Sequence, residues 1–114
     1  MELAELEKEL MEKNKWLFLK LKEQKDLIEK AGGSERNYRV ALAKKMLELR
    51  TEGMQITILS DIARGDKIIA ELKLNRDIDK GVALACKNGI DAIQSSMSSL
   101  QTLISRHRAE MKLI

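Results

Sequence analysis

The sequence of 114 residues contains no proline, and aromatic residues make up only 3% of it. Because so few aromatic side chains are present, any hydrophobic core must be aliphatic. Leu, Ile, Ala, Lys and Glu dominate instead, and this composition without proline is typical of helical bundles and coiled coils. The length leaves room for one domain with a moderate core. We therefore predict a single all-α domain over residues 1–114.

Scarce cysteine and histidine exclude several kinds of site. The single cysteine, Cys86, cannot form an intramolecular disulfide, and its place among apolar residues predicts a small buried side chain. With only one histidine, His107, the chain cannot assemble a zinc site by itself. Nucleophilic catalysis would need a base beside a serine or cysteine, and no such arrangement is recognisable. We expect no enzyme, no catalytic residue, no metal and no cofactor.

Long apolar runs and strong charge of one sign are also missing. No run approaches the roughly 20 apolar residues that span a bilayer, and the first residues are acidic rather than basic. We therefore expect a cytoplasmic protein without a membrane partner. The net charge of +3 is mild for a protein that coats nucleic acid, so charge alone does not decide the partner.

An uninterrupted heptad pattern fills the C-terminal half. Its positions alternate by three and four, which keeps one stripe of a helix facing another helix. They are Ile69, Leu72, Arg76, Asp79, Ala83, Cys86, Ile90, Ile93, Met97, Leu100, Ile104, His107, Met111 and Ile114. This seam predicts one long helix over about 66–112, with Asp66 as its N-cap.

Three further helices are predicted before the seam. A first long helix covers about 2–31, with a stripe made of Leu3, Leu6, Leu10, Leu17, Leu21 and Ile28. It should end at Gly32-Gly33, after which Ser34 would cap a medium helix over about 35–52. This Gly-Gly-Ser lacks the Gly-Lys-Ser/Thr that a P-loop requires. Gly53 and Gly65 should end the medium helix and a short helix over about 57–64, capped by Thr57. Residues 56–59 could form a strand by propensity, but no second strand is available to pair with it.

The predicted lengths suggest assembly between copies. A first helix over about 2–31 can cover only part of the final helix, so residues 69–86 or 90–114 should pair with a second subunit. We therefore predict a coiled-coil-like helical bundle that forms a dimer or a larger homo-oligomer. The residues expected at this oligomer seam are Ile69, Leu72, Ile90, Ile93, Met97, Leu100 and Ile104.

Charged residues suggest two ligand-binding hypotheses. Arg76 and Asp79 interrupt the apolar seam, where they could pair along the helix and fix its register. Alternatively, the seam opens there and Arg76 meets an anionic ligand. The middle of the chain is also rich in basic residues, and guanidinium groups beside a tyrosine could hold phosphate and stack on a base. The candidate ligand-binding residues are Tyr38, Arg39, Arg64, Lys67 and Arg76.

A nucleic-acid interpretation is also open. Residues 40–64 have the outline of a helix-turn-helix, in which Thr57, Ser60, Asp61 and Arg64 would face a DNA groove. The outline is unspecific, because any helix followed by a short helix has it, and the Asp61 carboxylate would repel phosphates.

Several short motifs in the middle of the chain resemble those of a protein family. They are Asn-Tyr-Arg-Val-Ala-Leu-Ala-Lys at 37–44, Glu-Gly at 52–53, Ile-Thr-Ile-Leu at 56–59, Asp-Ile-Ala-Arg-Gly at 61–65 and Arg-Asp at 76–77. With them the chain resembles small, functionally uncharacterised helical proteins of phages and prophages of Gram-positive bacteria. It departs from that pattern at Met54-Gln55, where a proline is expected. The resemblance implies no active-site residue.

Two roles are typical of small phage accessory proteins, and both remain open here. Our first hypothesis is a non-enzymatic binding protein that blocks a host protein or sequesters a small anionic, nucleotide-like ligand, for example to counteract a host defence. The alternative is a nucleic-acid-binding accessory protein of phage replication or recombination. A structural coiled-coil adaptor is a third interpretation.

Overall fold

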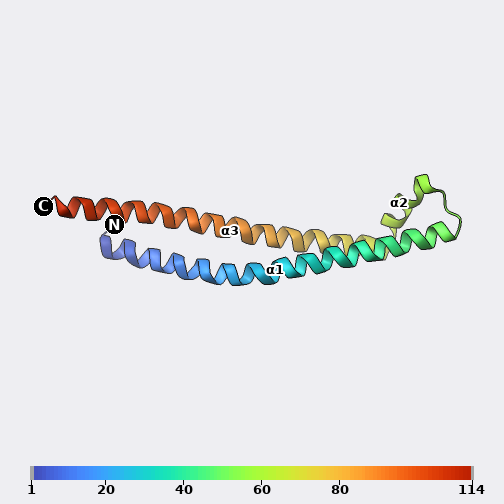
Figure 1. Cartoon of the computed structure of the whole chain (residues 1–114), viewed down its shortest axis with the longest axis horizontal. Helices are drawn as coiled ribbons and strands as arrows, with labels where there is room; N and C mark the ends of the chain where they lie inside the picture. The colour runs from blue at the N-terminus through green and yellow to red at the C-terminus, as the bar shows by residue number, and fades with distance from the viewer. Residues whose placement is uncertain (1, 114) are drawn as a thin grey trace. The chain divides into compact units, whose positions relative to one another are not determined.

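The structure, a computed structural model, describes residues 2–113 and contains three α-helices and no strand over that range. Helix α1 spans Leu3–Thr51, α2 spans Ile56–Gly65 and α3 spans Lys67–Lys112 (Figure 1). The all-α prediction is confirmed, and residues 56–59 are helical rather than extended. Internal contacts divide the chain into two units, and each is described here by itself. Unit 1 comprises Met1–Lys25 and Leu84–Ile114, and unit 2 comprises Asp26–Ala83.

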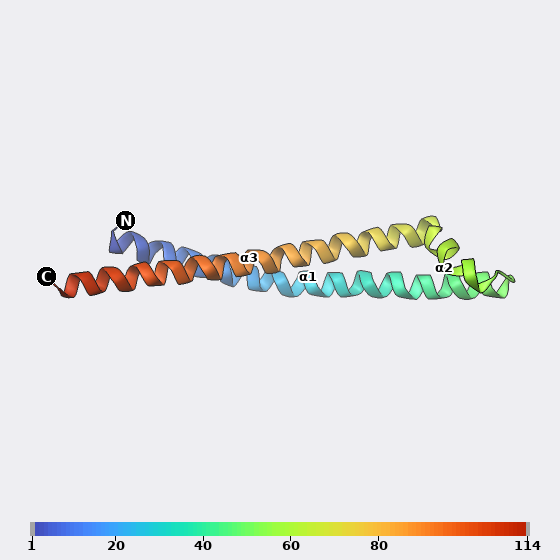
Figure 2. The same cartoon turned by 90° about the horizontal axis from the view of Figure 1, so that it is seen from above.

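Unit 1 is built from the first part of α1 and the last part of α3, which run antiparallel (Figures 1 and 2). Its core consists of Leu6, Leu100 and Ile104, with Leu3 and Leu10 packed against them. This core is aliphatic, as the composition predicts.

Two cross-helix contacts fix the level at which the helices of unit 1 meet. The buried Cys86 thiol donates a hydrogen bond to the Lys20 carbonyl oxygen over 3.7 Å. Arg108 Nη2 lies 2.9 Å from Glu7 Oε1. The prediction that Cys86 is a buried side chain is therefore confirmed.

Unit 2 contains α2, held between the end of α1 and the start of α3. Gly53 ends α1 with φ of 93°, a left-handed conformation that glycine adopts readily. The Met54 amide donates to the Leu49 carbonyl and the Gly53 amide donates to the Arg50 carbonyl, which is the Schellman pattern. Leu49, Leu59 and Ala63 form the core of this unit, with Leu42, Met46 and Met54 packed around it.

Asp66 caps α3 as predicted. Its Oδ1 atom accepts hydrogen bonds from the amides of Ile68 at 3.0 Å and Ile69 at 3.3 Å. Thr57, by contrast, lies inside α2 and is not its cap. Gln55 holds that position without a side-chain hydrogen bond.

The predicted break at Gly32-Gly33 is wrong, because α1 continues through both glycines and joins the predicted helices 2–31 and 35–52. Two glycines inside a helix cost about 2 kcal/mol relative to alanine. Packing on both sides offsets this cost, since Ala31 and Ser34 are partly buried. The Ser34 hydroxyl also donates to the Asp79 carboxylate on α3 instead of capping a helix.

The heptad register of α1 gives the physical reason for its continuity. Residues spaced alternately by three and four run from one end of the helix to the other across the glycines, and each is buried or partly buried. These are Leu3, Leu6, Leu10, Lys13, Leu17, Lys20, Gln24, Leu27, Ala31, Ser34, Tyr38, Ala41 and Lys45. The predicted stripe is therefore wrong at Leu21 and Ile28, which are exposed.

The seam of α3 faces α1 of the same chain. Every predicted seam position from Ile69 to His107 is buried or partly buried, whereas Met111 is exposed. Ile114 lies outside the described residues. Because α1 has 49 residues and α3 has 46, the premise that α1 is too short to cover the seam is wrong for the positions from Ile69 to His107. A second subunit would therefore have to bind elsewhere.

Candidate functional site

Arg76, the strongest ligand-binding candidate, lies in a cluster of charged side chains within unit 2. Its guanidinium carbon sits 4.6 Å from the centre of the Tyr38 ring. Its Nη2 and Nε atoms lie 2.9 and 3.0 Å from Asp77 Oδ1, and Nε is 3.5 Å from Glu35 Oε2. Arg76 therefore has a stacking partner and two carboxylate partners within its own chain.

Glu35 is the centre of this cluster. Arg39 Nε lies 2.7 Å from its Oε1 atom, and Lys80 Nζ lies 3.4 Å from its Oε2 atom. The hydrogen bond from Arg39 and the charge of Lys80 lower the pKa of Glu35 below its ordinary value of 4.5. The hydrogen bond to Asp77, with the charges of Asp77 and Glu35, raises the pKa of Arg76.

Asp79 does not pair with Arg76 along α3. It accepts the Ser34 hydroxyl hydrogen bond from α1, and Lys30 Nζ lies 3.8 Å from its Oδ1 atom. The alternative that these two residues pair with each other is therefore wrong, because each finds partners elsewhere. Polar groups that cross between two helices select one register, which is the structural role considered for this break in the seam.

The charge balance of the cluster argues against capture of an anion. Four cationic side chains, Lys30, Arg39, Arg76 and Lys80, contact three carboxylates, Glu35, Asp77 and Asp79. An incoming phosphate would have to displace a carboxylate from Arg76. The arrangement is suited to holding helices together.

The predicted ligand-binding residues are only partly brought together. Tyr38, Arg39 and Arg76 meet around Glu35. Arg64 lies in the last turn of α2 and Lys67 begins α3, and both are exposed. Sequence reasoning missed Glu35 and Lys80. In the continuous α1, Glu35 directly follows the seam residue Ser34, and on α3 Lys80 directly follows the seam residue Asp79. Charged pairs between two helices form at these heptad positions.

The helix-turn-helix hypothesis gains little from unit 2. Thr57, Asp61 and Arg64 are exposed on α2, but Ser60 is partly buried. Lys45 Nζ, a neighbouring basic group, lies 3.5 Å from Asp66 Oδ2 and 3.7 Å from Glu48 Oε2. The exposed Asp61 and these ion pairs reduce the positive charge available to a nucleic-acid backbone.

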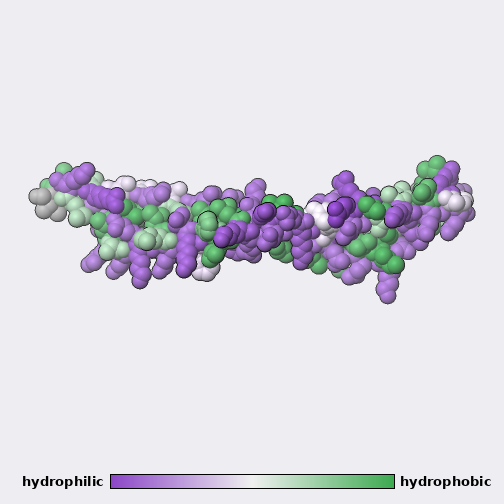
Figure 3. Space-filling view, turned by 60° about the horizontal axis from the view of Figure 1, so that its bottom comes forward, coloured by the Kyte–Doolittle hydropathy of each residue, from purple (hydrophilic) through white to green (hydrophobic). Residues whose placement is uncertain are grey.

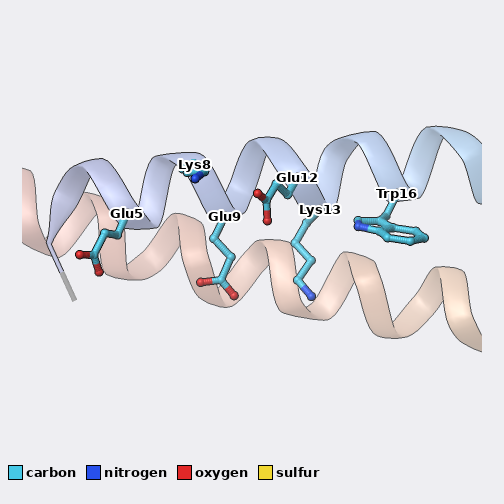
Figure 4. Close-up of a pocket in the computed structure, with 6 residues that line it drawn as sticks. All are labelled: Glu5, Lys8, Glu9, Glu12, Lys13 and Trp16. Carbon is cyan, nitrogen blue, oxygen red and sulfur yellow. The ribbon is translucent and has the colours of Figure 1, made fainter.

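A surface hollow on unit 1 is lined by α1 alone. Figure 4 shows its six residues projecting from that one helix: Glu5, Lys8, Glu9, Glu12, Lys13 and Trp16. A site that encloses a small molecule is normally concave and mostly apolar, whereas five of these six side chains are charged. The hollow is therefore part of an open helix face, on which Trp16 is the large apolar residue.

Exposed isoleucines distinguish unit 2. Helix α2 buries Leu59 and Ala63, whereas Ile58 and Ile62 on another of its faces are 47% and 48% exposed. Ile68 at the start of α3 is 70% exposed. We call the exposed Ile58, Ile62 and Ile68 the isoleucine surface; Arg64 and Lys67, which lie between Ile62 and Ile68 in the sequence, are also exposed. Figure 3 shows hydrophobic atoms reaching the surface at the end of the picture that carries α2.

Two general searches of residues 2–113 gave no candidate. Within that range no group of three or more His, Cys, Asp or Glu side chains could hold a metal ion. Among the described helices, none is both long enough and apolar enough to cross a membrane.

Acid should weaken unit 2 through Glu35 and Asp66. The amide hydrogen bonds from Ile69 and Ile68 lower the pKa of Asp66 below its ordinary value of 3.8. Because both carboxyl groups bind protons more weakly in the folded chain, their contribution is complete above the ordinary values and is lost as the pH falls through the folded ones. We expect the thermal midpoint, followed by circular dichroism, to fall from about pH 5 downward. Glu35→Gln should reduce the change of the thermal midpoint with pH, whereas Glu29→Gln, on the exposed surface of α1, should not. If both variants showed the same change with pH, the role given to Glu35 would be wrong.

No family model, curated protein or solved structure matches this chain.

Proposed function

We propose that this chain is a non-catalytic binding protein of phage type that acts in the host cytoplasm as a homo-oligomer and blocks a host protein by occupying it. The isoleucine surface carries the proposal. Apolar side chains that remain in water forgo about 25 cal/mol per Å² of buried area, and clustered ones are typical of protein interfaces. Ile58, Ile62 and Ile68 lie within eleven residues of sequence.

Two exposed basic residues close to the isoleucines in sequence indicate the chemistry of the partner. Arg64 and Lys67 were candidates for phosphate binding, and both are exposed. An apolar centre with basic residues beside it suits a protein groove with acidic residues at its rim. The shift of Arg76 and Glu35 away from their ordinary pKa values has a cause in ion pairing, so it supports a structural role rather than catalysis.

The test is capture of host protein by the immobilised chain from a lysate of Gram-positive bacteria. Ile58→Glu with Ile62→Glu should abolish capture of any specific protein. Gln55→Glu with Thr57→Glu adds the same charge to exposed positions of the same segment and should leave capture intact.

Salt separates this proposal from nucleic-acid binding. Binding to a phosphate backbone weakens steeply as salt rises, whereas an apolar protein interface is far less sensitive. Captured protein that persists at high salt is the expected result. Two results would contradict the proposal. One is that the substitutions at Ile58 and Ile62 leave capture unchanged, and the other is that the captured material is nucleic acid that salt releases.

A further inference from the structure

We propose that two copies of this chain form a four-helix bundle through one flank of unit 1. The flank, called here the Trp16 face, consists of Glu5, Glu9, Glu12, Trp16 and Leu19 of α1 and Ala85, Gly89, Ala92, Ser96, Ser99, Leu103 and Arg106 of α3. It supplies the interface for the proposed homo-oligomer and is independent of the isoleucine surface.

The heptad register places these residues on one side of the helix pair. Each helix has two seam residues per heptad. In an antiparallel pair, the residues that directly follow a seam residue lie on one flank of both helices, and those that directly precede a seam residue lie on the opposite flank. Glu7 and Arg108, which each directly follow a seam residue, form an ion pair across one flank of unit 1. Trp16 of α1 and Gly89 of α3 occupy the preceding positions, so the Trp16 face is the opposite flank.

The two helices contribute complementary shapes to this face. On α1, Trp16 and Leu19 are 57% and 50% exposed. On α3 the face carries no charge from Ala85 to Leu103 and consists mainly of alanine, glycine and serine. Gly89 lies inside a helix, at a cost of about 1 kcal/mol relative to alanine. A Cβ atom at that position would meet nothing within 4 Å, so packing within the chain does not require this glycine.

Two-fold symmetry fixes which residues would meet. If the axis runs parallel to the helices, the copies cannot be shifted along it, and α1 of one copy meets α3 of the other at the level seen within one chain. That level is set by Lys20 opposite Cys86 and by Leu6 beside Leu100 and Ile104. Trp16 and Leu19 of one copy then lie over Ala92 and Gly89 of the other, so the largest side chains meet the smallest.

The charges on the two helices agree with this pairing. At the same level, Glu12 meets Ser96, and Glu5 meets the turn that carries Leu103 and Arg106. An acidic helix thus faces an uncharged helix with a basic end, rather than another acidic one. The α1 part of the face, from Glu5 to Leu19, is about 21 Å long, and the face is two helices wide at about 9 Å each. A footprint of roughly 400 Å² per copy is at the small end of specific interfaces, where complexes dissociate on dilution.

The test uses matched serines and the only tryptophan. Ser96→Glu places a carboxylate opposite Glu12 of the other copy, whereas Ser98→Glu adds the same charge on exposed surface away from the face. Sedimentation equilibrium should give twice the chain mass for the native protein and for Ser98→Glu, and a single chain for Ser96→Glu. Adding Glu12→Lys to Ser96→Glu should restore the dimer by charge pairing. Circular dichroism should show equal helix content in all variants.

Trp16 fluorescence provides a second measurement on the same samples. Burial in the dimer should shift the native emission to shorter wavelength, and dilution or Ser96→Glu should reverse the shift. A native monomer at high micromolar concentration would overturn the proposal, as would a dimer that Ser96→Glu does not weaken. Ile58→Glu with Ile62→Glu should leave the dimer intact, so failure of the partner surface and failure of this interface are distinguishable.

Discussion

Leu100→Asp should unfold unit 1. Leu100 is 7% exposed and packs with Leu6 and Ile104. Removing a buried leucine side chain costs about 2–5 kcal/mol, and the unpaired carboxylate adds a further penalty. Since small domains are stable by only about 5–15 kcal/mol, the helical signal should be lost at much lower urea concentration, or be reduced even without urea.

Leu84→Asp is the matched control for this substitution. Leu84 lies on the same helix and in the same unit but is 57% exposed. The same change there should shift the urea midpoint only slightly. Equal losses from both substitutions would contradict the assigned register of α3, and so would a Leu100→Asp variant as stable as the native chain.

The second prediction concerns the two glycines inside α1. Gly32→Ala and Gly33→Ala should each stabilise the chain by about 1 kcal/mol. A Cβ atom at either position meets nothing within 4 Å, so the substitutions gain helix propensity without a clash. Urea unfolding followed by circular dichroism measures the gain, and the double variant should show nearly the sum.

Gly53→Ala is the contrasting control. Gly53 has φ of 93°, a conformation that costs a residue with a side chain about 1–2 kcal/mol. That substitution should destabilise unit 2 even though it is the same chemical change. If Gly33→Ala destabilised the chain in the way that Gly53→Ala does, the helix would end at Gly32-Gly33 and the continuous α1 would be wrong.

The long helix α3 could be predicted from sequence because its signals agree. The seam from Ile69 to His107 has no slip, and Asp66 provides a capping side chain. The end of α1 at Gly53 could be predicted equally well. Each of these features depends on residues close in sequence, where periodicity and capping are most informative.

The continuity of α1 was missed because Gly-Gly-Ser is also a good helix stop. The decisive signal was the register: Ala31, Ser34 and Tyr38 continue the alternation that begins at Leu3. Leu21 and Ile28 obscured it, because these apolar residues resemble core positions more than Lys13 and Lys20, which occupy the true stripe.

The partners of Arg76 could not be predicted for a related reason. Local spacing pointed to Asp79, whereas Glu35 lies on another helix and becomes a neighbour only after the helices pair. The hydrophobic residues Trp16 and Ile62 are exposed in one chain. They contribute to the surfaces proposed here for binding.

Native mass spectrometry of gently purified protein tests most directly whether this chain binds through apolar helix faces rather than by capturing a small anion at Arg76. We predict a dimer without added small-molecule mass, in the native chain and in Arg76→Ala whenever that variant remains folded. Additional mass matching a nucleotide, present in the native chain and absent from a folded Arg76→Ala variant, would contradict the account and establish Arg76 as a ligand site.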